Sequence, residues 1–279
     1  FVDDVVARSQ ETLALPGHPG LAATFAVTYE ALAPEQQRLF RTLGIFAPGP
    51  LALVHVAGVL EQEVAVVEPR LDELVAAAYL GYDQAQPGRY TLHPLLRDYA
   101  VRLLGAAGER EGAEGRHLAC FLALAEANQA AEPAAWDQLE VALPDLQLAV
   151  QTAVRRQEHA AVRSFGNTLY GKSEFLSTRG YNQLAREVLS HMLDVCRALE
   201  DAEGEAAALG NLGLVAMEQG DYAAARTYHE QALELHTRLG NPLGQANQLG
   251  NLGLVAMDQG AYAAARTYHE QALELHTRL

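Results

Sequence analysis

The chain has 279 residues, a length that suggests about two domains, and 49% of them are hydrophobic. A disordered chain would be poorer in apolar residues. The formal net charge of −15 argues against general nucleic-acid binding, because affinity for phosphates comes from Lys and Arg. Two cysteines, Cys120 and Cys196, cannot form a disulfide framework, so we expect a reducing, cytoplasmic setting. No signal peptide and no run of about 18 apolar residues is visible, so we expect no membrane partner.

Both ends of the chain look cut. No initiator methionine precedes Phe1, and Leu279 ends inside a repeating pattern. We therefore expect this chain to be part of a longer protein.

The first hundred residues predict short helices followed by a β-hairpin. Helical patterns cover four ranges: 21–32, 35–45, 51–60 and 68–80. Alternating residues at 79–82 and 89–92 flank a polar segment with a Pro-Gly pair, which predicts the hairpin, and a last helix is expected over 95–104. Helices followed by a two-stranded wing are typical of a winged-helix domain, which we place at residues 20–105.

Residues 21–104 resemble the winged-helix domain of STAND-type signalling ATPases, the NB-ARC group. The stretches that carry the resemblance are TYEAL at 28–32, QRLF at 37–40, LGIF at 43–46 and RYTLHPLLRDYA at 89–100. The resemblance implies that residues 1–19 are the tail of a preceding ATPase module. ADP or ATP would be the cofactor of that missing module, and we expect no cofactor in this chain alone.

One histidine has a role in this resemblance. The stretch around His93 is similar to the Met-His-Asp region of plant immune receptors, in which the histidine contacts the β-phosphate of ADP and holds the resting state. Leu92 and Pro94 replace the Met and the Asp, so only the role of the histidine carries over. From the residues alone, His93 is instead a helix N-cap histidine, partly buried between wing and helix.

A winged helix could also bind DNA. Its recognition helix, at about residues 68–80, carries Glu68, Asp72 and Glu73 against Arg70 alone. A helix that enters the major groove needs the reverse charge balance, so we expect nucleic-acid binding to be unlikely.

Residues 106–160 form a predicted helical bridging segment. Its helical patterns cover three ranges: 116–128, 136–143 and 144–156. The stretch VALPDLQLAV at 141–150 resembles the bridging segment of bacterial STAND regulators. We expect no phosphate-cradling loop of the GxxxxGK[ST] type in the chain, and therefore no enzyme activity in this part of the protein.

A 40-residue repeat fills the C-terminal part. Residues 210–239 and 250–279 match at 28 of 30 positions. Each copy holds two helical patterns that are separated by a glycine, at Gly220 and Gly260. Periods of 20–50 residues indicate a solenoid in which each unit buries its apolar face on its neighbours.

The repeat resembles a tetratricopeptide repeat (TPR). The matching residues of the first copy are Leu209, Leu212-Gly213, Gly220-Asp221-Tyr222, Ala225, His229 and Ala232, and all of them except Asp221 recur 40 residues later. A divergent third copy occupies about residues 161–200, with its first helix expected at 163–178 and Lys172-Ser173 where Leu-Gly should stand. The predicted fold class is thus mainly α, with a TPR solenoid over 161–279 that includes copies at 206–240 and 246–279.

The repeats suggest a partner-binding surface. Asn211 and Asn251 are expected near the concave face, where the resemblance implies an asparagine that bonds the backbone of a bound peptide. The same surface should include Leu214, Met217, Glu218, Leu254, Met257 and Asp258. The alternative is that these residues recur only because the copies are nearly identical.

The histidines of the repeats invite a metal interpretation, which we reject. His229 and His236 are seven positions apart, so about 10 Å separates them on one helix, too far for one zinc. His229 and His269 occupy a position that is often aromatic, and we expect them in the core or lining a groove.

Three functions follow from the sequence. The first is the sensing and regulatory part of a STAND ATPase, in which the winged helix holds the nucleotide-bound off state and the TPR array binds an inducer or partner protein. The second is a stand-alone TPR scaffold, and the third is a DNA-binding regulator. The last helix, 263–279, would leave an apolar face uncovered, which predicts self-association of the chain.

Overall fold

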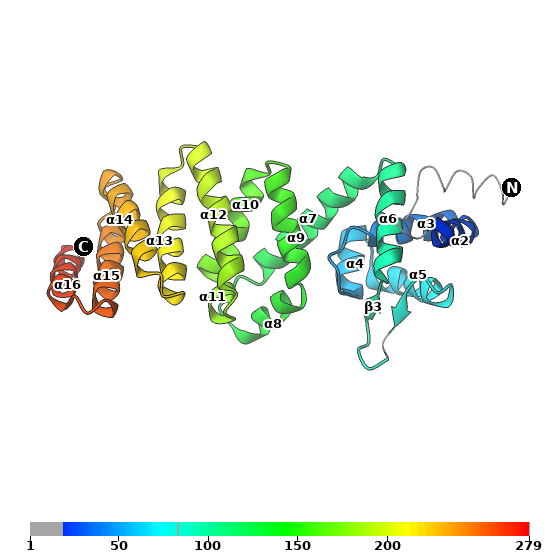
Figure 1. Cartoon of the computed structure of the whole chain (residues 1–279), viewed down its shortest axis with the longest axis horizontal. Coiled ribbons are helices and arrows are strands. Elements are labelled where there is room, and N and C mark those ends of the chain that lie inside the picture. The colour runs from blue at the N-terminus through cyan, green and yellow to red at the C-terminus, as the bar shows by residue number, and fades with distance from the viewer. Residues whose placement is uncertain (1–18, 83, 279) are drawn as a thin grey trace. The chain divides into compact units, whose positions relative to one another are not determined.

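The computed structural model describes residues 19–82 and 84–278. Its described part is mainly α-helical with one small sheet, as the sequence predicts (Figure 1). The chain divides into two compact units, Phe1–Ala123 and Leu124–Leu279, and the division falls inside helix α7 (Arg110–Ala127). The expectation for the first residues, as the tail of an ATPase module, lies outside the described residues except at Pro19. No helix within the described ranges is long and apolar enough to cross a membrane.

The first unit has the element order of a winged helix. Its elements before α7 are α2 (Pro19–Glu30), α3 (Pro34–Leu43), β1 (Pro50–Ala52), α4 (Leu53–Leu60), α5 (Val64–Ala76), β2 (Gly81–Tyr82), β3 (Arg89–Thr91) and α6 (Pro94–Ala106). The three strands form an antiparallel sheet in the order β1-β3-β2, so the predicted hairpin is confirmed.

Two predictions for this unit were wrong in detail. Residues 51–60 were expected as one helix, but residues 50–52 form strand β1, which pairs with β3. A strand of three residues shows no readable period, and Pro50 occupies its first position, where proline is tolerated. Helix α5 begins at Val64 rather than at residue 68. Pro69 lies inside this helix, where it removes one backbone hydrogen bond without ending the helix.

An aromatic cluster forms the core of the first unit. The rings of Phe40 and Tyr79 meet edge to face with centroids 4.7 Å apart, and Tyr29 meets Tyr99 edge to face at 6.1 Å. The Tyr79 hydroxyl donates to Thr28 Oγ1 at 2.6 Å, so this buried phenol is satisfied. The cluster joins α2, α3 and α6 to the loop that follows α5.

The second unit is a stack of helices. Beyond α7 it contains α8 (Pro133–Val141), α9 (Leu143–Arg155), α10 (His159–Gly166), the π-helix η1 (Asn167–Lys172), α11 (Phe175–Thr178), α12 (Asn182–Ala198), α13 (Ala202–Glu218), α14 (Tyr222–Arg238), α15 (Pro242–Asp258) and α16 (Tyr262–Thr277). Consecutive helices from α12 to α16 pack on one another (Figure 1). The predicted helix pairs of the repeats are confirmed.

The divergent copy differs from its prediction. Residues 163–178 were expected as one helix, but α10, η1 and α11 share this range. Ser173 is fully buried, its hydroxyl donates to the Leu169 carbonyl at 3.2 Å, and its own carbonyl accepts from Trp136 Nε1 at 2.6 Å. Glu174 then has a left-handed backbone with φ 53°, which interrupts the helix.

Candidate functional site

Helices α13 and α15 carry the predicted partner-binding surface. They are the first helices of the two similar repeats, and they contact each other directly. The positions of Asn211, Leu214, Met217 and Glu218 are separated by three, three and one residues, so they lie on one side of α13. The corresponding residues of α15 lie on the same side of that helix.

The two asparagines occupy equivalent positions on α13 and α15. Both are half-buried. The Asn211 amide nitrogen lies 4.0 Å from the position that a Cβ would take on Gly171 of η1. Gly171 is therefore a neighbour of Asn211, and we call the side of α13 and α15 that carries these residues, together with the adjoining part of η1, the repeat face.

The apolar residues of the repeat face are exposed to different degrees. Leu254 is 44% exposed and Met257 is 46% exposed. Leu214 and Met217 are only half-buried, and Met217 packs against a cluster of Ala216, Ala225 and Val255. Met217 thus contributes to the contact between repeats, whereas Leu254 and Met257 are available to another molecule.

The two acidic residues of the repeat face, Glu218 and Asp258, are both exposed. Partial burial raises the pKa of the Glu218 carboxyl. Burial, together with the nearby charge of Glu218, raises the pKa of the Tyr170 hydroxyl, so these side chains are close. The repeat face therefore combines apolar side chains with negative charge.

His229 is a core residue of the repeats, as the sequence predicts. It is fully buried, and its ring lies against Gly213, where an added Cβ would be 2.4 Å from Cε1. Its Nδ1 lies 2.8 Å from Gln248 Oε1, so Nδ1 carries the proton and Nε2 is left buried without a partner. The described residues contain no group of three or more His, Cys, Asp or Glu that could hold a metal.

Sequence reasoning missed Gln248. This residue is 7% exposed and supplies the acceptor for the His229 ring. The available signal was a polar residue where the preceding copy has Ala208, on the buried side of the first helix.

His93 caps helix α6, but it is exposed rather than partly buried. Its Nδ1 accepts a hydrogen bond from the Leu95 backbone at 3.2 Å, which confirms the N-cap. The residue lies two positions after the end of β3 and is exposed. Arg97, in the same stretch, donates to the Phe46 and Ala47 carbonyls and holds α6 against the loop after α3.

The expectation that the chain lacks the pattern GxxxxGK[ST] was wrong. Residues 166–173 read GNTLYGKS, which has this spacing. A phosphate-binding loop connects a strand to a helix and leaves its amides free. Here the residues end α10 and form η1, and the Ser173 hydroxyl is bonded to the Leu169 carbonyl. The match is therefore helical, and its geometry does not support a phosphate-cradling loop.

Comparison with known families identifies the repeats. Two models described as tetratricopeptide repeat match residues 164–238 and 246–279. The C-terminal part of the chain therefore consists of tetratricopeptide repeats, and the first match includes the divergent copy.

The chain is also similar to longer proteins. It is 40% identical over 97 residues to the Regulatory protein AfsR of Streptomyces coelicolor, covering 34% of this chain and 9% of that protein. It is 40% identical over 79 residues to the Regulatory protein AfsR of Streptomyces griseus, covering 28% and 8%. The chain thus spans less than a tenth of these relatives. The crystal structure of BtubC (BKLC) from P. vanneervenii is 16% identical, with coverage of 81% and 89% and a TM-score of 0.44.

Proposed function

We propose that this chain is the sensing and regulatory part of a STAND-type signalling ATPase. In this proposal the repeats bind a protein partner, and the winged-helix unit restrains the nucleotide-bound off state. The repeats themselves and the similarity to a protein named as regulatory support the general role. Neither tests the nucleotide step.

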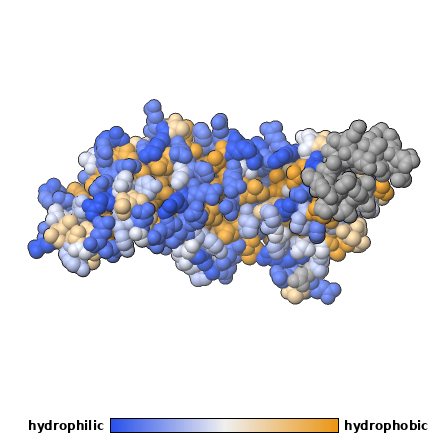
Figure 2. All heavy atoms as spheres, in the orientation of Figure 1, coloured by the Kyte–Doolittle hydropathy of each residue, from blue (hydrophilic) through white to orange (hydrophobic). Residues whose placement is uncertain are grey.

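The repeat face carries the partner-binding half of the proposal. Leu254 and Met257 are exposed next to the amide of Asn251 on one side of α15. An amide both donates and accepts, so it can pair with the backbone of an extended peptide while the apolar side chains contact the peptide's own. Figure 2 shows hydrophilic residues over much of one face of the molecule, with apolar residues between them. The nearby Glu218 and Asp258 favour a peptide with basic residues.

Peptides selected for binding to the full chain would test this half. We expect the Asn211→Ala/Asn251→Ala double variant to lose at least about tenfold in affinity, because each amide would lose hydrogen bonds that are desolvated on binding. Gln231→Ala/Gln271→Ala is the matched control, since these exposed residues lie on the second helices of the same repeats. Equal affinity of both double variants would contradict a site on the repeat face.

The geometry of His93 suits the nucleotide half of the proposal. Because Nδ1 accepts from Leu95, the neutral ring carries its proton on Nε2. An exposed Nε2–H can donate to a phosphate oxygen of a nucleotide bound to an adjoining domain. The N-cap thus presets the tautomer that the proposed contact needs.

The protein extended at its N-terminus would test the nucleotide half. We expect ADP to copurify with the extended protein and to be lost from its His93→Ala variant. Absence of ADP, or full retention of ADP in the variant, would leave a TPR scaffold without a nucleotide latch. The peptide experiment decides that scaffold role independently.

A further inference from the structure

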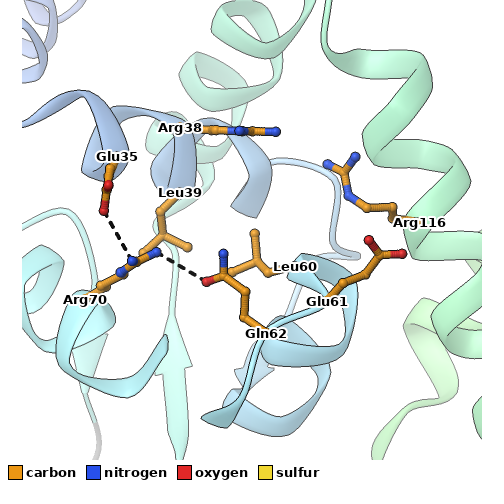
Figure 3. Close-up of a pocket in the computed structure, with 8 residues that line it drawn as sticks. All are labelled: Glu35, Arg38, Leu39, Leu60, Glu61, Gln62, Arg70 and Arg116. Atoms are coloured by element: carbon orange, nitrogen blue, oxygen red, sulfur yellow. Dashed lines mark hydrogen bonds and ion pairs between the residues drawn. The ribbon is translucent and has the colours of Figure 1, made fainter. Parts of the chain in front are cut away.

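A polar cavity of about 300 Å³ lies within the first unit. Residues from α3, α4, α5 and α7, and from the turn after α4, line it (Figure 3). Three arginines, Arg38, Arg70 and Arg116, are among these residues, and Leu39 and Leu60 supply an apolar wall. Nothing in the nucleotide or partner-binding roles proposed above uses this cavity.

Arg70 pairs with two other residues of the cavity wall. Its Nη2 lies 3.2 Å from Glu35 Oε2, and its Nη1 donates to Gln62 Oε1 at 3.2 Å (Figure 3). The Glu35 carboxylate compensates its charge. Arg70 therefore shapes the cavity but is not its anion receptor.

Arg38 and Arg116 remain available. Figure 3 shows their side chains reaching toward each other across the cavity. Arg116 donates through Nε to the Val59 carbonyl at 3.2 Å, which fixes the stem and leaves its two terminal nitrogens for another acceptor. No ion pair joins either residue to a carboxylate among the described residues.

The positive charges of both arginines act on the Glu109 carboxylate. The charges of Arg38 and Arg116 contribute to lowering the pKa of Glu109, after the larger effect of its hydrogen bond with Arg41. That bond, 2.7 Å from Arg41 Nη2 to Glu109 Oε1, occupies the Glu109 carboxylate. Two guanidinium groups thus face one cavity, and the Glu109 carboxylate, whose pKa both of them lower, is hydrogen-bonded to Arg41.

We propose that this cavity binds a small molecule that carries a phosphate monoester group, held between Arg38 and Arg116. One guanidinium fork satisfies both oxygens of a carboxylate, whereas a phosphate has three terminal oxygens and can accept from two diverging guanidiniums. A phosphate monoester also carries a charge of about −1.5 to −2, which suits two cations. Leu39 and Leu60 would contact the organic part of the ligand.

The charge of Glu61 should weaken the binding of a phosphate ligand in this cavity. Glu61 follows α4 with a left-handed backbone, φ 56°, and Figure 3 shows its carboxylate on the cavity side, near Arg116. Its charge opposes an anionic ligand. Removing that charge should therefore tighten binding, whereas removing either arginine charge should weaken it.

The proposal is tested by isothermal titration calorimetry, in which phenyl phosphate is added to the full chain at constant ionic strength. Benzoate serves as the carboxylate with the same apolar body. We expect saturable binding of phenyl phosphate, weakened about tenfold or more by Arg38→Gln and by Arg116→Gln, and tightened at least about twofold by Glu61→Gln. Arg38 and Glu61 are exposed, so their variants decide the matter if Arg116→Gln fails to fold.

Two controls remove the same positive charge elsewhere. Arg102→Gln lies on α6 of the same unit, and Lys172→Gln alters the GNTLYGKS stretch. We expect both to bind phenyl phosphate like the parent chain. Absence of binding, equal weakening in Arg102→Gln, loss confined to Lys172→Gln, or equally tight binding of benzoate would each overturn the proposal.

Discussion

At the scale of single residues, Gly213 and Gly253 have no room for a side chain, because a histidine ring packs against each of them. A Cβ on Gly213 would be 2.4 Å from the His229 ring, whereas a Cβ on Gly250 would have no neighbour within 4 Å. We expect Gly213→Ala to destabilise the chain by about 1–3 kcal/mol through overpacking, and Gly250→Ala to be neutral or stabilising. Urea denaturation followed by circular dichroism measures both. Equal midpoints for the two variants would contradict the close packing at His229.

His229 also predicts a pH dependence. Burial lowers its pKa below the ordinary value of 6.5, and the bond to Gln248 offsets part of that effect. Below about pH 6.5 the unfolded chain therefore binds a proton that the folded chain does not. The free energy of unfolding thus decreases as the pH is lowered, until the pKa of the folded chain is reached. Above that range both states are neutral and this contribution is constant.

The matched variant isolates this contribution. His229→Phe keeps an aromatic ring but cannot titrate. The free energy of unfolding of the parent chain should fall more steeply from pH 7 to pH 5.5 than that of the variant, by at most about 1.4 kcal/mol per pH unit. If the free energies of unfolding of the two proteins instead change in parallel with pH, His229 takes up its proton equally in the folded and the unfolded chain, which contradicts the prediction. His236, whose pKa burial also lowers, contributes equally to both proteins.

At the scale of the helix, the two nearly identical copies differ in one N-cap. The Asp221 carboxylate accepts from the Ala224 amide at 3.1 Å at the start of α14. Ala261 takes the same position before α16, without a side-chain cap. We expect Ala261→Asp to stabilise the chain and Asp221→Ala to destabilise it, each by about 1 kcal/mol. Thermal melts of the two single variants check this, and shifts of the same sign would contradict the capping role.

Elements with a long period could be predicted from the sequence, and short ones could not. The 40-residue repeat fixed α13–α16 and placed His229 in the core, because identical spacing recurs twice. Strand β1 has three residues and takes its conformation from pairing with β3, which no local pattern encodes. The π-helix η1 likewise ends at a contact between distant positions, the hydrogen bond from Trp136 to the Ser173 carbonyl.

The candidate sites can be separated in the same way, into residues that recur in the sequence and residues that occur once. The residues of the repeat face lie on one side of α13 and of α15 because they recur at helical spacing, whereas their contact with a partner stays a prediction. Gln248 occurs once, and its role appears only when its amide meets the His229 ring on the neighbouring helix. The facing of Arg38 and Arg116 joins positions 78 residues apart, on α3 and α7, which one sequence cannot pair.

At the scale of the whole molecule, each repeat contacts only its neighbours, so stability should vary along the array. Eight residues of α13 are buried, whereas the buried residues of α16 among those described are Ala265 and Ala272. Hydrogen exchange should therefore be slower in α13 than in α16, because local opening of α16 exposes less apolar surface. Uniform protection across the array would mean that it opens only as one unit.

The same measurement links stability to the proposed function. A peptide bound on the repeat face contacts α13 and α15, so it should slow exchange in both helices, since ligand binding stabilises the closed state. Asn211→Ala/Asn251→Ala should abolish that slowing without altering exchange in the free chain. Slowing confined to α14 and α16 would instead place the peptide on the second helices, and the repeat face would then serve only the packing between repeats.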